Sequence, residues 1–150
     1  SKSHGFPGVR IGYVYSNNLN LISDIKKSLP VWNFNSFAEY FLEIMLKYRN
    51  EFKISIDKTI YDRQEFIKNM KLQKWVNKVF DSSADFILVE TDIKILNLVS
   101  ILLHQDSIYI RDISTKFNDG KSYFRFAVRT SNENNLMISK INNHLKVYDV

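Results

Sequence analysis

Three arginines near the end of the chain have a spacing that suits anion binding. Alternation along "SYFRFAVRT" (residues 122–130) puts Phe124, Phe126 and Val128 on one face. It puts Tyr123, Arg125, Ala127 and Arg129 on the other, outward face. In "SIYIRD" the same alternation separates Arg111 from two isoleucines. Planar guanidinium groups bind carboxylate and phosphate, so a site for both anions is one interpretation. A solvated sheet face is the other, and periodicity alone favours it.

The opening "SKSHGFPGVRIGY" is the second candidate for chemistry. It holds three of the four glycines, one of the two prolines, and Lys2 eight residues before Arg10. In a chain that is otherwise poor in glycine, this concentration predicts an unusual backbone course. A loop with a solvated lysine is the alternative.

Composition excludes several classes of function. The 150 residues suffice for one domain with a real core, and the net charge of +5 is scattered rather than gathered in a basic block. The chain has no cysteine and no metal-ligand spacing among its three histidines. No apolar run is long enough to cross a bilayer. We therefore expect no metal, membrane or nucleic-acid partner, and a cytoplasmic location.

Periodicity indicates the elements that must position these residues. We expect strands over 9–16, 85–90, 107–112 and 122–130, and helices over 18–29, 36–52, 59–72, 92–105 and 131–148, with a weakened helical signal over 53–58. Capping boxes are expected at Ser36–Glu39 and Thr130–Glu133. Two helices carry apolar stripes, made of Leu96, Val99 and Leu103 and of Met137, Ile141, Leu145 and Tyr148. The pattern predicts an α/β fold (α+β layered) with a small, mostly antiparallel sheet packed with helices.

The opening resembles the cofactor-lysine segment of class I/II pyridoxal-phosphate aminotransferases of fold type I. It is closest to the histidinol-phosphate aminotransferase and threonine-phosphate decarboxylase branch. The family pattern is Ser/Thr-Lys, a Gly-containing turn, then Gly-x-Arg-x-Gly-Tyr, which Lys2 and Arg10 match in spacing. Further matches follow in order at "PVWNFNSFAEYF", Arg63, "SSADFILVE", "IYIRD" and "YFRFAVRTSNEN". Several matches in order make the resemblance specific.

The resemblance implies a role for each candidate residue. Lys2 would bond to the aldehyde of pyridoxal phosphate and then move a proton at the substrate, because a desolvated amine can lose its proton. Arg10 and Ser1 would bind the cofactor phosphate. Arg125 would hold the substrate carboxylate and Arg111 its distal phosphate. Arg129 would either join this anion site or be solvated.

The implied function is transfer of an amino group between an amino acid and a keto acid or aldehyde that carries a phosphate or phosphonate. One alternative is decarboxylation of a phosphorylated amino acid such as threonine phosphate. A non-catalytic dimerisation or regulatory module is another, against which the joint presence of Lys2, Arg10 and Arg125 argues. A nucleic-acid-binding domain is a remote third, because no basic stripe or recognition helix is present.

In the family the lysine lies past the middle of a longer chain. We therefore expect the C-terminal portion of such a protein, with residues 1–34 ending the large cofactor-binding domain and 35–150 forming the small domain with its connecting helix. A homodimer is expected for the full-length protein. The 150 residues alone are expected to hold the cofactor poorly and to be inactive.

Overall fold

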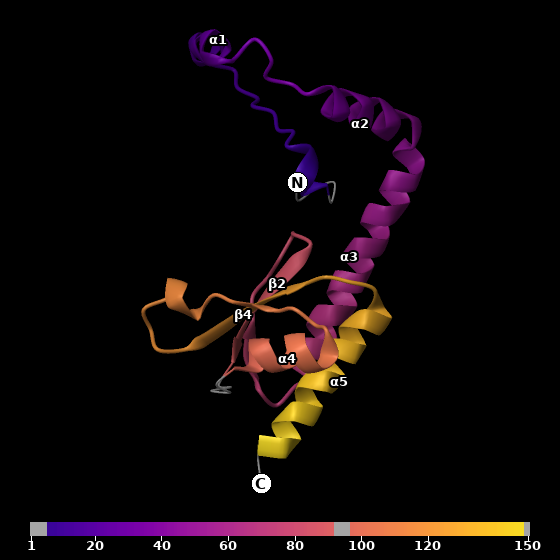
Figure 1. Ribbon diagram of the computed structural model, residues 1–150, viewed down its shortest axis with the longest axis vertical. Helices are drawn as coiled ribbons and strands as arrows, with labels where there is room; N and C mark the ends of the chain where they lie inside the picture. Colours follow the sequence, from indigo (N-terminus) through magenta and orange to yellow (C-terminus); the bar gives the residue numbers. More distant parts are fainter. Residues whose placement is uncertain (1–5, 92–96, 149–150) are drawn as a thin grey trace. The chain divides into compact units, whose positions relative to one another are not determined.

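The computed structural model describes residues 6–91 and 97–148. The chain divides into two compact units, Ser1–Lys53 and Ile54–Val150, which are described separately (Figure 1). The division at residues 34 and 35 concerns domains of a larger fold and stays a prediction.

The first unit contains the short 3₁₀ helix η1 (Pro7–Val9), α1 (Leu19–Ser28) and α2 (Ser36–Lys47). Helix α1 confirms the sequence prediction. Helix α2 begins at Ser36 as predicted, but it ends at Lys47 instead of residue 52, because the helical conformation is interrupted at Tyr48. The Ser36–Glu39 capping box was wrong by one residue. Asn35 is the N-cap, because its side-chain oxygen accepts a hydrogen bond of 2.8 Å from the backbone N–H of Ala38.

The strand predicted over 9–16 is not formed. Val9 ends η1, and the rest of the segment is irregular, with Tyr13 and Tyr15 93% and 84% exposed. An extended segment needs a neighbouring strand to satisfy its backbone N–H and C=O groups. None of the four strands in the described part of the chain pairs with it.

Little of the first unit is buried. The rings of Phe6 and Phe41 lie 4.7 Å apart between η1 and α2, and Val9 and Ala38 are buried. Helix α1 buries none of its side chains. Val31 and Trp32, between α1 and α2, are 94% and 90% exposed. The unit therefore exposes an unusually large amount of apolar surface to solvent.

Helix α3 (Arg49–Lys71) runs without interruption through 53–58, where a weakened helix was expected. This stretch holds β-branched residues, whose helix propensity is only slightly low, and neither glycine nor proline. Thr59 also donates its hydroxyl to the carbonyl of Ser55 at 2.8 Å. Nothing in the segment is strong enough to end a helix.

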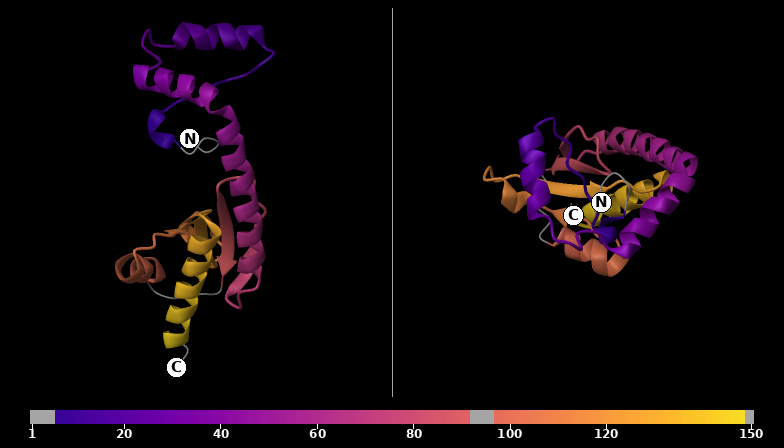
Figure 2. Two further views of the ribbon diagram at one scale, coloured as in Figure 1. Left: turned by 90° about the vertical axis from the view of Figure 1, so that its right-hand side faces the viewer. Right: turned by 90° about the horizontal axis from the view of Figure 1, so that it is seen from above.

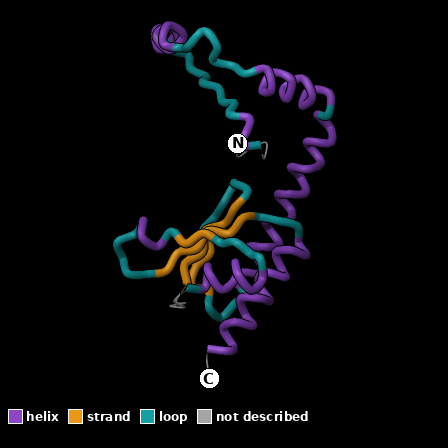
Figure 3. The backbone as a smooth tube through the Cα atoms, viewed as in Figure 1, coloured by secondary structure: helices purple, strands orange, loops and turns teal. Residues whose placement is uncertain are grey.

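The second unit is built on the expected antiparallel sheet. Its strands, drawn in orange in Figure 3, are β1 (Val76–Val79), β2 (Phe86–Thr91), β3 (Arg111–Asp112) and β4 (Ser122–Ala127). The pairing of the strands gives the order β1-β2-β4-β3. Sequence periodicity missed β1, which is short and lies against β2. The strand expected over 107–112 is reduced to its last two residues.

One face of this sheet carries the core. Phe124 and Phe126 are buried as the alternation predicted, and they face the same way as Ile87 and Val89 of β2. Helices α3, α4 (Leu98–Asp106) and α5 (Ser131–Tyr148) lie beside the sheet (Figures 1 and 2). Their side chains complete the same apolar cluster. The rings of Phe66 in α3 and Phe126 meet edge to face at 6.4 Å. The opposite face, with Phe86, Leu88 and Arg125, is the open face of the sheet.

The apolar stripe predicted for α4 was wrong in register. Leu98 and Leu102 are buried, whereas Leu103 is 42% exposed and Val99 is half-buried. The stripe of α5 is confirmed where it is described, since Met137 and Ile141 are buried and Leu145 packs against the core. Leu96 and the side chain of Tyr148 lie outside the described residues.

The second capping box is confirmed at the start of α5. The hydroxyl of Thr130 donates to Oε2 of Glu133 at 2.6 Å, and the backbone N–H of Glu133 lies 3.4 Å from the Thr130 hydroxyl. The Thr130 hydroxyl and then Arg129 lower the pKa of Glu133 to about 2. The ionised carboxylate is therefore the form that caps the helix.

Glu133→Ala is expected to lower the midpoint of urea unfolding at pH 7, because it removes this cap. A lowered folded-state pKa means that the stabilisation is present above the ordinary value of 4.5 and is lost as pH falls toward about 2. The difference between wild type and variant should therefore shrink over that range. A difference that is independent of pH would assign the stabilisation to packing instead.

Candidate active site

Arg111 and Arg125 are brought together by the pairing of β3 with β4. The two residues are direct cross-strand partners, so their side chains leave the same face of the sheet. Arg125 is half-buried and Arg111 is exposed. Within the described residues neither guanidinium has a carboxylate partner. Like charges placed opposite each other are destabilising unless solvent or a bound anion offsets them.

The aromatic ring beneath Arg125 was not predicted. The guanidinium carbon of Arg125 lies 4.9 Å from the ring centroid of Phe86 in β2. Leu88, two residues along β2, is the direct partner of Arg125. The sequence analysis predicted a strand over 85–90 and gave Phe86 no role in the site. The alternation of this strand does put Phe86 and Leu88 on one face, but only the register of β2 against β4 brings that face to Arg125.

The other charges on the open face have partners of their own. Glu90 of β2 is buried and forms an ion pair with Lys121, in which Oε1 of Glu90 lies 2.7 Å from Nζ of Lys121. Tyr123 was expected on the same outward face as Arg125, but it is buried against Phe117, whose ring lies 4.2 Å away. Its hydroxyl donates to Asp119 at 2.6 Å. This hydrogen bond, with burial, raises the pKa of Tyr123 to about 12, so the phenol stays neutral.

Arg129 is not part of the arginine pair. It follows the end of β4, and its Nε and Nη2 atoms lie 3.3 Å and 2.9 Å from Oε1 of Glu133. Its backbone N–H donates to the side chain of Asn134. These contacts tie Arg129 to the start of α5 and favour the second of the two interpretations given above. Its assignment to substrate binding stays a prediction.

The opening segment is described only in part, because Ser1 and Lys2 lie outside the described residues. Arg10 follows η1, is exposed, and has a left-handed backbone with φ 57° and ψ 42°. Among the described glycines only Gly120 has positive φ. In the described part of the opening, the left-handed backbone thus occurs at Arg10 and not at Gly8 or Gly12, while Gly5 lies outside the described residues. A non-glycine residue in this conformation costs about 1–2 kcal/mol, a strain typical of functional sites.

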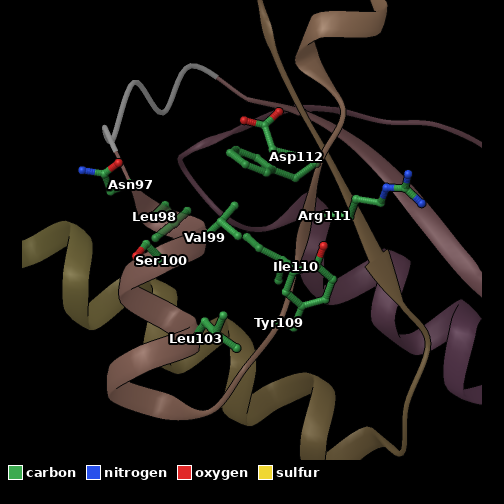
Figure 4. A pocket seen from close by; sticks show the side chains of 10 residues that line it. Asn97, Leu98, Val99, Ser100, Leu103, Tyr109, Ile110, Arg111 and Asp112 are labelled. Carbon is green, nitrogen blue, oxygen red and sulfur yellow. The ribbon is translucent and has the colours of Figure 1, made fainter.

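A cavity of about 530 Å³ lies beside this site, between α4 and the segment that leads into β3. The residues that bring polar groups to its lining are Asn97, Ser100, Tyr109, Arg111 and Asp112. Figure 4 shows the Arg111 guanidinium directed away from the α4 side chains. Arg111 therefore borders the cavity, while its guanidinium is directed away from α4.

Within residues 6–91 and 97–148, no helix combines the length and apolar character needed to cross a bilayer. No cluster of three or more histidine or acidic side chains in this part of the chain could hold a metal ion.

An antiparallel sheet backed by helices on one face, with two paired arginines on the other, defines an α/β domain whose open face carries adjacent cationic groups. The chain belongs to the family "Aminotransferase class I and II", whose model matches residues 1–141. This finding confirms the resemblance seen in the sequence. Members of this family use pyridoxal phosphate, act on small molecules and usually form dimers.

Individual relatives agree with the branch predicted from the sequence. The chain is 31% identical over 147 residues to L-serine phosphate decarboxylase of Campylobacter jejuni, covering 94% of this chain and 37% of that protein. The histidinol-phosphate aminotransferase structure from Clostridium acetobutylicum superposes with a TM-score of 0.79 at 28% identity, over 91% of this chain and 41% of that one.

L-Threonine-O-3-phosphate decarboxylase from Porphyromonas gingivalis gives a TM-score of 0.81 at 24% identity, covering 96% of this chain and 44% of that one. At this identity the match shows the fold alone. The chain thus spans less than half the length of each of these three relatives.

Proposed function

We propose that the chain is the C-terminal part of a pyridoxal-phosphate-dependent aminotransferase whose substrate carries a phosphate or phosphonate. The observation that carries this proposal is the direct pairing of Arg111 with Arg125 on the open face of the sheet. Two guanidinium groups on adjacent strands suit a substrate with a carboxylate at one end and a second anion at the other.

The donor groups of this chain suit the cofactor. The amine of Lys2 can bind an aldehyde. The hydroxyl of Ser1 and the exposed guanidinium of Arg10 can bind a phosphate. When bound, pyridoxal phosphate supplies an electron sink. Lys2 would hold the aldehyde and move a proton at the α-carbon of the substrate. Arg10 and Ser1 would hold the phosphate, and Arg125 would fix the substrate by its carboxylate.

The rest of the proposal concerns the whole protein. Its amino donor and acceptor are small molecules, it works as a homodimer in the cytoplasm, and the 150 residues alone are inactive. The first unit exposes apolar side chains such as Val31 and Trp32. This exposure supports the proposal that other parts of the fold or a second subunit cover them in the whole protein.

A decarboxylase is the second candidate, because one of the relatives described above decarboxylates L-serine phosphate. The full-length protein, loaded with pyridoxal phosphate, should be incubated with phosphoserine, threonine phosphate and histidinol phosphate, with and without a keto acid. Amino transfer that depends on the keto acid supports the aminotransferase. Release of carbon dioxide without it would establish the decarboxylase, and neither product would overturn both.

Separate roles for the two arginines predict separate effects. Arg125→Gln should lower kcat/KM about 30- to 1,000-fold for every substrate with a carboxylate, because it removes the guanidinium that would make charge-assisted hydrogen bonds to that carboxylate. Arg111→Gln should lower kcat/KM for phosphoserine while leaving that for serine nearly unchanged. Arg49→Gln is the matched control, since Arg49 is an exposed arginine at the start of α3 that is not among the candidate site residues. Equal losses for phosphoserine and serine in Arg111→Gln would contradict the assignment.

A further inference from the structure

The guanidinium of Arg125 has an aromatic surface beneath it. Phe86 pairs directly with Ala127 and Arg125 pairs with Leu88, so Phe86 and Arg125 are diagonal neighbours across β2 and β4. Diagonal neighbours in an antiparallel pair are within reach of long side chains. The result is the cation–π contact of 4.9 Å between the guanidinium carbon and the Phe86 ring.

The side chain opposite Phe86 leaves room for this contact. Ala127 is the smallest residue of β4, and it occupies the position where a large side chain would compete for the ring. Phe86 and Arg125 are both half-buried, which reduces the competition of water with the contact. The stacked pair is thus specified by one aromatic residue, one small residue and the register of two central strands.

Arg125 needs such a support because of its other neighbour. Arg111 is its direct partner on β3, and two like charges at this spacing repel each other. Without a fixed surface, Arg125 would lower its electrostatic free energy by turning its guanidinium away from Arg111. Turned away, its fork would no longer be presented to an anion beside the one that Arg111 binds.

We infer that Phe86 is a positioning residue, which holds the Arg125 guanidinium in the orientation that receives the substrate carboxylate. This inference rests on the proposed function, in which Arg125 binds that carboxylate. Phe86 itself does not touch the reacting atoms. Its contribution is to reduce the conformational freedom that Arg125 would otherwise lose on binding.

The test uses the full-length protein with the variants Phe86→Leu and Phe86→Tyr. Leucine keeps the apolar bulk of the side chain but has no π face, whereas tyrosine keeps the ring. Phe80→Leu is the matched control, because Phe80 is another half-buried aromatic residue, and its ring lies beneath Lys78 at 4.7 Å instead of beneath an arginine.

The first readout is independent of any substrate. In the wild-type protein labelled with ¹⁵N-arginine, the ring current of Phe86 should shift the Nε–H proton of Arg125 upfield, with the resonance assigned by its loss in Arg125→Gln. The shift should vanish in Phe86→Leu and persist in Phe86→Tyr and Phe80→Leu. An Nε–H shift that is the same in Phe86→Leu and wild type would overturn the inference.

The second readout is binding by calorimetry of phosphoserine and of phosphoethanolamine, which lacks the carboxylate. Phe86→Leu should weaken phosphoserine binding about 3- to 30-fold, the range that a cation–π contact supplies, and leave phosphoethanolamine binding unchanged. Equal weakening of both probes would mean general distortion and would overturn the inference.

Failure of the proposed function is distinguishable from failure of this inference. If Arg125→Gln leaves phosphoserine binding unchanged, Arg125 does not bind the carboxylate and the proposed function is wrong on that point. The inferred orienting role then fails with it, although the Nε–H shift still reports the stacked pair. If Arg125→Gln weakens phosphoserine binding and Phe86→Leu does not, only the role of Phe86 is refuted.

Discussion

Lys2→Ala is expected to abolish the visible absorbance band of the full-length protein loaded with pyridoxal phosphate. The band would arise from the covalent bond between the lysine amine and the cofactor aldehyde, and alanine has no amine to form it. Turnover should fall at least about 10³-fold, because general-base catalysis alone contributes about 10²- to 10⁴-fold and the covalent anchor is lost as well.

Lys26→Ala is the control for this experiment. Lys26 lies in the last turn of α1, is exposed, and belongs to no segment matched to the cofactor site. Its replacement should leave both the band and the turnover unchanged. A Lys2→Ala protein that keeps its band would refute the role of Lys2. A wild-type protein that never forms the band would favour the non-catalytic module instead.

Phe126→Ala is expected to destabilise the second unit by about 3–5 kcal/mol, the cost typical of removing a buried phenylalanine side chain. Phe126 is 1% exposed, and its ring lies 6.4 Å from those of Phe66 and Phe124. The truncation leaves a cavity between α3 and the sheet that neighbouring helices cannot fill without moving. The measurement is the free energy of unfolding from urea denaturation followed by circular dichroism.

Phe37→Ala serves as the comparison, because Phe37 in α2 is 71% exposed. It should change the free energy of unfolding by less than about 0.5 kcal/mol, as surface substitutions usually do. Similar losses for the two variants would mean that the first unit has a core of its own that these contacts do not reveal. A loss below about 1 kcal/mol in Phe126→Ala would contradict the packing described for the sheet.

The sequence by itself determined features that depend on near neighbours along the chain. The capping box at Thr130–Glu133, helix α1 and the alternation of β4 follow from local hydrogen bonds and periodicity, and all are found. The outward direction of Arg111 and Arg125 follows from the same alternation. The family, too, was recognisable from ordered motifs, because cofactor chemistry requires particular residue types at particular spacings.

Only the tertiary structure decided features that depend on contacts distant in sequence. The register of β3 and β2 against β4 places Arg111 opposite Arg125 and Phe86 beneath it. The buried face of α4 and the existence of β1 depend on the surfaces they pack against, and none of the described strands pairs with segment 9–16. Periodicity gives the face of a side chain along its own strand, but the partner it meets is chosen by pairing and packing free energies summed over the whole fold.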